Sequence, residues 1–410
     1  MASPRVLQFP LSAISILRHA RCYSSFTGAT NPIPATFLRG GTSKGIFLNR
    51  AHLPSDQSQW DPIFLGIMGS PDAQYGRQLN GMGGGVSNVS KICVVGSPSE
   101  SQKAAQIDAE YTFAQVGIRD SLIDYSGNCG NLSSMIGVFA VDEGICIPRV
   151  SHGPKMTGTV HTFNTNTNKR IDNTFLVTER GGHWVPVLDG EQASIAGVPG
   201  RASPILLDFV DPSGARTGRL LPTGLPQQTV RISLSSSREV TFPVSLVDAT
   251  NPTVFTDDQG LRSALNIPDD TSIDYAELDI VDALERVRQV GARLMDLDPL
   301  AQAQPKVAVL GRPPPDDTDA DIVINAFSMG TLHRAVPMTV GLCLGVAARV
   351  PRTLAWDIVK DWRCDAGELL RIRHPGGVVE VGAELDSGGE VISARVMRTG
   401  RRLMRGVVWW

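Results

Sequence analysis

The chain has 410 residues, of which 42% are hydrophobic and 19% are charged, and its formal net charge is -3. This is an ordinary globular composition, and the length is sufficient for two domains with separate cores. The near-neutral charge and the lack of a basic, aromatic stripe argue against a nucleic-acid binder. No apolar stretch approaches the roughly 20 residues that cross a bilayer, so no membrane partner is expected.

Cysteines and histidines are scattered along the chain. The six cysteines form no C-x-x-C pair, and the seven histidines show no paired-ligand spacing. This pattern indicates reduced thiols in a reducing compartment, not a disulfide framework or a zinc site. The glycine cluster at 83–85 does not follow G-x-G-x-x-G, and residues 41–45 are not a P-loop. We therefore expect no metal and no cofactor.

The amino-terminal segment, residues 1–30, differs from the rest. It contains Arg5, Arg18 and Arg21 among serines and apolar residues, and no Asp or Glu precedes Asp56. Such a composition is typical of a mitochondrial transit peptide. The alternatives are a secretory signal, against which the arginines argue, and a disordered tail. The sequence therefore predicts a mitochondrial protein, with a cytoplasmic location as the alternative.

Alternating segments and glycine-rich turns predict mostly strands in the first half. Residues 36–39 and 45–48 flank the turn at 40–44, which is typical of two strands joined by a tight turn. Residues 91–95 (KICVV) predict a short apolar strand that follows the glycine cluster.

The sequence NCGN at 128–131 directly precedes the small, apolar run 132–140. It predicts a tight turn that places Cys129 at the first turn of a buried helix. There a thiol lies beside unpaired N–H groups and the positive end of the helix dipole, which lowers its pKa. The same N–H groups can bind an anion. The pattern indicates acid–base chemistry on a small anion, and the alternative is a cysteine that only packs.

The second half repeats this order of elements. Residues 205–209 begin a new set of strands, and apolar positions between Asp274 and Leu294 follow a helical period. The sequence FSMGT at 327–331 then precedes an apolar run at 335–350 that predicts a core helix. The end of the chain, 391–410, predicts a terminal strand or hairpin. Each half would therefore contain a strand, a turn and a buried helix.

Several motifs, taken in order, resemble those of the PrpF-like 2-methylaconitate isomerase family. They are FLRGGTSKG at 37–45, GGGVSNVSK at 83–91, CGN at 129–131 with FAVDEG at 139–144, LPTG at 221–224, DATNP at 248–252 and MGTLHRA at 329–335. The resemblance implies an α+β, diaminopimelate-epimerase-like fold with two pseudo-symmetric domains, each a curved, mostly antiparallel sheet wrapped around a central helix. We expect the first domain at 34–203 and 386–410 and the second at 204–385.

The resemblance also implies the site residues. Lys91 and Cys129 fall on the positions of the family's acid–base pair. The positions in ligand-facing motifs are Arg39, Thr42, Ser43, Lys44, Ser87, Asn88, Asn131, Asn251, Met329, Gly330 and His333. As alternatives, the two basic residues at 39 and 44 are surface charges, His333 packs or caps at its helix, and Asn251 shapes a turn.

The chain departs from the family at two positions that concern turn geometry and pocket size. Thr250 stands where the family usually has Gly, and Val138 where it more often has Pro. Epimerases and racemases of this fold carry a cysteine in each half. Here the corresponding turn reads Ser328-Met329-Gly330, so a two-thiol racemase is disfavoured.

The expected function is a cofactor-independent isomerase of an unsaturated tricarboxylate such as aconitate or 2-methylaconitate. One group removes a proton next to the double bond, a dienolate forms, and an acid returns a proton elsewhere or after rotation. The alternatives are an amino-acid epimerase on the same fold and a non-enzymatic accessory protein of an iron–sulfur, aconitase-like dehydratase. The expected partner is the small tricarboxylate, and a homodimer and a functional link to such a dehydratase are further candidates.

Overall fold

The computed structural model describes residues 30–234, 238–301, 304–328, 330–360 and 369–410. The predicted transit segment, apart from its last residue, and the predicted site residue Met329 lie outside these ranges.

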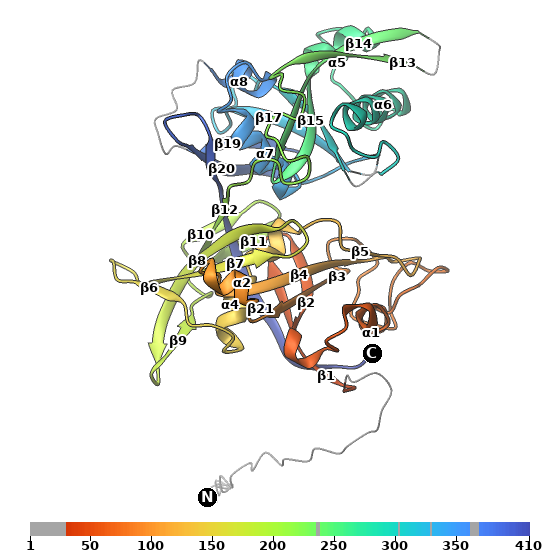
Figure 1. The fold of residues 1–410 in the computed structure, drawn as a ribbon. Helices are drawn as coiled ribbons and strands as arrows, with labels where there is room; N and C mark the ends of the chain where they lie inside the picture. The colour runs from red at the N-terminus through yellow and green to blue at the C-terminus, as the bar shows by residue number, and fades with distance from the viewer. Residues whose placement is uncertain (1–29, 235–237, 302–303, 329, 361–368) are drawn as a thin grey trace, which may run out of the picture.

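Figure 1 shows two lobes stacked end to end, with β12 (Pro204–Val210) and β21 (Val391–Val408) at their junction. The first lobe contains β1 (Ile33–Gly40), β2 (Ser43–Asn49), β3 (Lys91–Gly96), β4 (Ala109–Val116), β5 (Ile123–Asp124), β6 (Arg149–Ser151), β7 (Thr157–Asn164), β8 (Lys169–Arg180), β9 (His183–Pro186), β10 (Ala193–Ile195) and β11 (Val198–Ala202). Its helices are α1 (Trp60–Met68), α2 (Glu100–Ala104), α3 (Gly130–Ser133) and α4 (Ile136–Asp142), with short 3-10 turns at Arg50–His52 and Gln57–Gln59.

The second lobe contains β13 (Gln228–Ser233), β14 (Glu239–Ala249), β15 (Asn251–Asp257), β16 (Lys306–Gly311), β17 (Ile322–Ser328), β18 (Thr331–Leu332), β19 (Leu370–His374) and β20 (Gly377–Leu385). Its helices are α5 (Asp258–Leu265), α6 (Leu278–Leu294), α7 (Met338–Ala347) and α8 (Leu354–Val359).

The two lobes share one order of strand pairing, which confirms the predicted pseudo-symmetry. In the first lobe β1 and β2 form a hairpin, β2 and β3 run parallel, β3 and β4 antiparallel, and β4 and β7 parallel. The second lobe repeats this with β14 and β15, then β16, β17 and β19. Strand β21 connects the lobes because it pairs with β20, β12 and β1 in turn.

The predicted domain boundary falls between residues 203 and 204. Strand β12 follows that boundary directly, and it pairs antiparallel with both β8 and β21. Its register matches Asp208 with Asp172 of β8 and with Arg395 of β21. The exact limits of the two domains stay a prediction.

Each lobe wraps its sheet around an apolar central helix. All but one residue of α7 are buried, as expected for a helix that is apolar on every side. In the first lobe the predicted single helix is wrong, because it divides into α3 and α4. Ser133 and Ser134 sit at the break and donate to the carbonyls of Cys129 and Asn131, at 3.0 and 2.7 Å. Such side-chain bonds compete with the helical ladder and bend it.

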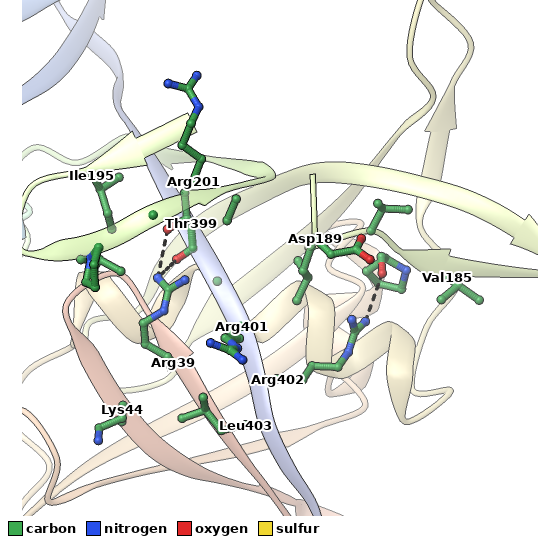
Figure 2. A pocket seen from close by; sticks show the side chains of 18 of the residues that line it. Arg39, Lys44, Val185, Asp189, Ile195, Arg201, Thr399, Arg401, Arg402 and Leu403 are labelled. Atoms are coloured by element: carbon green, nitrogen blue, oxygen red, sulfur yellow. Dashed lines mark hydrogen bonds between the residues drawn. The ribbon is translucent and has the colours of Figure 1, made fainter. Parts of the chain in front are cut away.

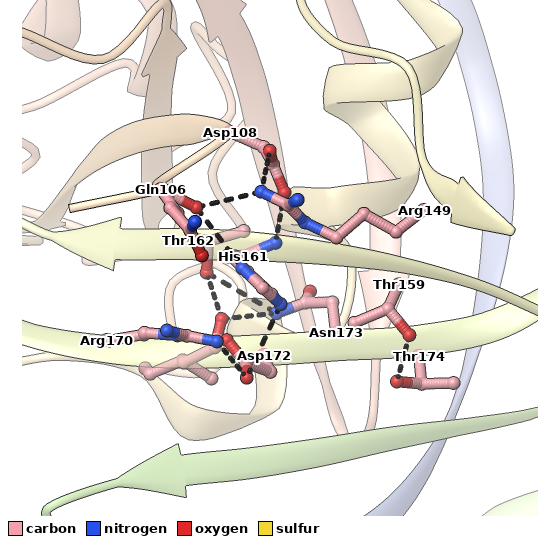
Figure 3. A network of polar contacts seen from close by, with 11 residues as sticks. Gln106, Asp108, Arg149, Thr159, His161, Thr162, Arg170, Asp172, Asn173 and Thr174 are labelled. Carbon is pink, nitrogen blue, oxygen red and sulfur yellow. Dashed lines mark hydrogen bonds and ion pairs between the residues drawn. The ribbon is translucent and has the colours of Figure 1, made fainter. Parts of the chain in front are cut away.

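A polar network on β7 and β8 supports the first lobe (Figure 3). Asp108 accepts hydrogen bonds from Arg149 and from the backbone of His161, both at 2.8 Å. Deeper in the sheet, the side chain of Asn173 accepts from the backbone N–H of Gly137 at 3.1 Å. That bond satisfies one of the N–H groups that the start of α4 leaves without an intrahelical partner.

Three element predictions in the second half are confirmed. Helix α6 covers the periodic segment, α7 lies within the apolar run, and β21 forms the terminal strand. The buried stripe of α6 runs through Ile280, Leu284 and Val287, whereas Leu278 is exposed. Within the described ranges, no helix has the length and apolarity that a membrane crossing requires.

Candidate active site

The β1–β2 hairpin ends against the start of α3, and glycine is required there for space. A Cβ on Gly40 would lie 2.5 Å from the Asn131 carbonyl oxygen, and one on Gly41 would lie 2.2 Å from Asn131 Oδ1. Gly41 also has a φ of +51°, a conformation that L side chains rarely adopt. Thr42 completes the contact, because its hydroxyl accepts from Asn131 Nδ2 at 3.1 Å.

Cys129 is the N-cap residue of α3 and is partly exposed. Its Sγ lies 3.8 Å from Ser43 Oγ. Its carbonyl accepts from the backbone N–H of Ser133 at 2.9 Å, which fixes the turn. The predicted position of the thiol at a helix start is confirmed, although that helix is a single turn.

Lys91 is the first residue of β3, and only 9% of its surface is exposed. Its ammonium group donates to Gln115 Oε1 and lies 5.1 Å from the centre of the Phe113 ring. The amide of Gln115 is oriented by the carbonyls of Ser87 and Ser90, at 3.2 and 2.9 Å. The lysine is therefore held in one place without a carboxylate partner in any of these contacts.

Lys91 and Cys129 lie near alternate residues of β2. Ser43 contacts the thiol, and a Cβ on Gly45 would lie 2.9 Å from the Lys91 carbonyl. Residues two apart on a strand face the same side and are separated by about 7 Å. Both groups also act on the Cys93 thiol: burial raises its pKa well above the ordinary value, Cys129 raises it further and Lys91 opposes the rise. The structure thus brings the two predicted catalytic residues to one place.

The second lobe reaches this place through two contacts. A Cβ on Gly130 would lie 3.3 Å from Met338, so the starts of α3 and α7 meet. A Cβ on Gly127 would lie 4.0 Å from Gln304 Nε2, and the same amide donates to Asn251 Oδ1 at 3.0 Å. The predicted residue Asn251 therefore lies beside the loop that carries Cys129.

Lys306 and His333 bring further basic groups to the junction. Burial, with repulsion from Arg288, lowers the pKa of Lys306 to about 8, and Asp124 of the first lobe opposes the change. Partial burial lowers the pKa of His333 despite a bond with the Ala335 carbonyl, and Lys306 and Lys91 lower it further. Because both lysines act on one imidazole, the three groups share a basic environment suited to a polycarboxylate.

Arg39 and Lys44, by contrast, face another pocket. Side chains alternate along a strand, and Gly40 already faces α3, so Arg39 points to the opposite side. It donates to the carbonyls of Gly41 and Thr399, at 3.1 and 2.8 Å. Both residues line a pocket of about 750 Å³ together with Arg201 and Arg401 (Figure 2). The structure therefore separates these two predicted ligands from Cys129.

The remaining predicted positions are at the margin. Ser87 and Asn88 are exposed, and their carbonyls accept from Gln115 and from the backbone of Lys44, at 3.2 and 2.9 Å. Gly330 is exposed with a φ of +71°.

Sequence reasoning missed Lys306, and a signal for it was available. Strand β3 reads KICVVG and β16 reads KVAVLG. Both begin with lysine, end with glycine, and follow a parallel partner in the same place in the repeat. Comparison of the two hexapeptides would have identified Lys306 as the counterpart of Lys91.

The two-lobed, pseudo-symmetric fold places a lysine and a cysteine at the junction, and both residue types can act as acid or base. Comparison with known proteins then gives the family. The model of the PrpF protein family matches residues 30–410. The chain belongs to the PrpF family.

Named relatives and solved structures agree with this assignment. The chain is 35% identical to the 3-methylitaconate isomerase of Eubacterium barkeri over 92% of its own length and 97% of the relative. It is 32% identical to the 2-methyl-aconitate isomerase of Shewanella oneidensis, over 92% and 96% of the two chains. A crystal structure of methylitaconate-delta-isomerase superimposes with a TM-score of 0.74 at 32% identity, covering 92% and 95%. A hydroxyproline epimerase of Agrobacterium vitis, at 12% identity and a TM-score of 0.50, shares the fold.

Proposed function

We propose that the protein isomerises an unsaturated tricarboxylate of the aconitate type, with Lys91 and Cys129 as its acid–base pair. The observation that carries this proposal is the meeting of the two groups at the start of β2, where the second lobe adds Lys306 and His333. Lys91 is oriented by Gln115 and the Cys129 thiol by Ser43, so both side chains are positioned without a ligand. Such pre-organisation is what proton transfer at carbon requires.

The reaction follows from this arrangement. One member of the pair takes a proton from the carbon next to the double bond. The C–H electron pair then moves into the conjugated system and places negative charge on a carboxylate, which gives a dienolate. The other member returns a proton at the far end of that system, or at the first carbon after rotation. The cationic groups at the junction stabilise the dienolate because they are present before its charge develops.

Two carboxylate classes are represented among the relatives. 3-Methylitaconate carries two carboxylates and 2-methylaconitate carries three, and the proteins named for them are similarly distant from this chain. The number of basic groups at the junction favours the tricarboxylate. A double-thiol epimerase has no support in the described part of the second lobe, because Cys343 is buried in the middle of α7 and bonds the Val247 carbonyl at 3.5 Å.

Proton NMR in deuterated water tests the proposal. cis-Aconitate, trans-aconitate, 2-methylaconitate and 3-methylitaconate would each be incubated with wild type, Cys129→Ser and a Cys146→Ser control. We expect conversion of a tricarboxylate with deuterium uptake, unchanged in the control and lowered about 100-fold or more in Cys129→Ser. Faster conversion of 3-methylitaconate would reassign the substrate class, and full activity in Cys129→Ser would remove the thiol from the mechanism.

We also propose that residues 1–30 direct the protein to mitochondria. The support is the sequence alone, with arginine and serine present and acids absent before Asp56. Cell fractionation with sequencing of the mature amino terminus tests this. An intact amino terminus in the cytosolic fraction would contradict it.

A further inference from the structure

A pocket of about 300 Å³ lies beside the start of α3, because Asn131 of that helix is among its lining residues. Thr42 and Asn131 line it from the first lobe, Met338 and His374 from the second, and Arg398 from β21. Asn131 is two residues from Cys129, and two residues span at most about 7 Å. The pocket is therefore within the reach of a small polycarboxylate that is bound at the thiol.

Arg398 is buried in this pocket with an incomplete set of partners. Only 6% of its surface is exposed. One terminal nitrogen donates to the Met397 carbonyl at 3.0 Å, and the other contacts the sulfur of Met338 at 2.7 Å. A thioether is a weak acceptor, and Nε has no hydrogen-bond partner in the described structure. A buried guanidinium normally has a carboxylate or several oxygen acceptors, whereas the described contacts of this one are a single carbonyl and a sulfur.

The surroundings of Arg398 leave its charge uncompensated. Burial lowers its pKa to about 9, so the group is still charged at neutral pH. His374 is neutral there, because burial and repulsion from Arg398 lower its pKa to about 4. Its Nδ1 accepts from the backbone N–H of Gly376 at 3.0 Å. Glu380 is the one carboxylate that lines the pocket within the described residues, and it is exposed and paired in register with Arg371.

Two donors next to Arg398 suit an anionic ligand. Asn131 Nδ2 uses one N–H on the Thr42 hydroxyl, and this leaves its second N–H available. The Thr42 hydroxyl accepts that bond, so its own hydrogen is free to donate. Together with the charge of the Arg398 guanidinium, which lines the same pocket, these two donors suit a carboxylate.

We propose that Arg398, Thr42 and Asn131 bind one carboxylate of the substrate and select tricarboxylates over dicarboxylates. The inference rests on the proposed function, because it takes the reacting carbons to lie at Lys91 and Cys129. Two carboxylates then stay beside the lysines, and the third enters the Arg398 pocket. Arg398 is a specificity-determining residue and takes no part in proton transfer.

Calorimetric titration with saturated probes tests this pocket independently of turnover. Tricarballylate carries three carboxylates and methylsuccinate carries two, and neither has a double bond to isomerise. The variants are Arg398→Met, which keeps an unbranched apolar stem without the charge, and Arg398→Lys, which keeps the charge without the planar fork. Arg395→Met is the matched control on the same strand, since Arg395 pairs with Asp208 outside the pocket.

We expect Arg398→Met to weaken tricarballylate at least 10-fold and methylsuccinate less than 3-fold. Arg398→Lys should weaken tricarballylate by about 3- to 10-fold, because the bidentate geometry is lost. Arg395→Met should match wild type. Equal weakening of both probes, or of neither, in a folded Arg398→Met would overturn the inference. If Arg398→Met does not fold, unchanged tricarballylate affinity in Arg398→Lys overturns it.

The outcomes separate this inference from the proposed function. If wild type converts no unsaturated acid, but Arg398→Met selectively loses affinity for tricarballylate, the pocket binds a carboxylate and the proposed isomerase function is wrong. If wild type isomerises aconitate and Arg398→Met keeps the wild-type preference for three carboxylates, the isomerase stands and the proposed role of the pocket is wrong.

Discussion

The two lobes use one topology for different chemistry. Each has a hairpin, then a parallel strand that begins with a buried or partly buried lysine, Lys91 or Lys306, and then a central helix. The helix starts differ. In the first lobe Cys129 stands at the turn, whereas α7 begins at Met338 after Pro337. Cys129 has a thiol that can exchange protons, whereas Met338, at the start of the other central helix, has a thioether that cannot.

The hairpin turns differ in the same way. Gly41 has a φ of +51° and lies against Asn131, while Thr250 has a φ of +64° and bonds α7 through its side chain. The first turn is built for close approach to the catalytic helix, and the second joins its own helix by a hydrogen bond. The comparison supports the proposal that the first lobe supplies the proton-transfer pair and the second lobe holds the ligand.

Removing the two lysines in turn would test this division most strongly. We expect Lys91→Met to lower kcat about 1,000-fold, within the range for loss of a general acid or base. Lys306→Met should raise KM about 10- to 100-fold with a smaller change in kcat, because it would lose a carboxylate contact. Steady-state kinetics on the substrate found by NMR measures both, with Lys103→Met on α2 as the control. Equal losses of kcat in the two variants would mean that both lobes catalyse.

The thiols should differ in reactivity by at least about 10-fold. Cys129 is partly exposed, whereas burial raises the pKa of Cys343 and of Cys146 to about 12. A thiol with a raised pKa holds little thiolate near neutral pH and alkylates slowly. We expect iodoacetamide to modify Cys129 fastest of the described cysteines, and trans-aconitate to protect it. Peptide-resolved mass spectrometry separates these sites from Cys22 and Cys364.

Rapid labelling of Cys343 would contradict the division between the lobes. It would give the second lobe a reactive thiol and restore a two-thiol mechanism.

Binding should weaken above about pH 8 if Lys306 holds a carboxylate. The pKa of Lys306 lies near 8 in the folded protein, below its ordinary value of 10.5. Its ammonium charge is therefore present below pH 8 and is lost as the pH rises through 8. We expect the Kd of tricarballylate to rise up to about 10-fold between pH 7.5 and 9. Lys306→Arg should flatten this dependence, because a guanidinium stays charged. An unchanged slope in Lys306→Arg would assign the titration to another group.

Much of this organisation was predictable from local sequence. The glycine turn, the NCGN motif and the apolar run before residue 350 predicted a strand, a turn and a helix in each lobe, because these features depend on residues close in the chain. The helix break at Ser133 and Ser134 was missed. It depends on side-chain bonds to preceding carbonyls, a weak signal beside a strongly apolar run.

Which pocket each basic side chain lines was harder to predict. Arg39 and Lys44 belong to the right motif, yet strand alternation turns them to the pocket of Figure 2. Arg398 carries no local signal at all. It reaches the pocket beside the start of α3 because β21 crosses from one lobe to the other, a pairing between residues far apart in the chain.

The smallest expected effect concerns Thr250, at the turn where the resemblance implies glycine. Its positive φ costs roughly 1–3 kcal/mol, while its hydroxyl bonds the Thr339 carbonyl at 2.7 Å and contributes about 1 kcal/mol. Thr250→Gly removes both and adds about 0.5–1 kcal/mol of unfolded-state entropy, so we expect the free energy of unfolding to change by between about −1 and about +1.5 kcal/mol.

Thr250→Val separates the two terms because it keeps the branched side chain at positive φ and loses only the hydrogen bond. We expect it to lower the free energy of unfolding by about 1–3 kcal/mol and to melt a few degrees below Thr250→Gly. Thermal unfolding followed by circular dichroism measures the difference. A Thr250→Val variant that melts together with wild type would mean that the bond to α7 stabilises nothing. Thr250 would then be a tolerated substitution, and the second turn would differ from Gly41 only in its strain.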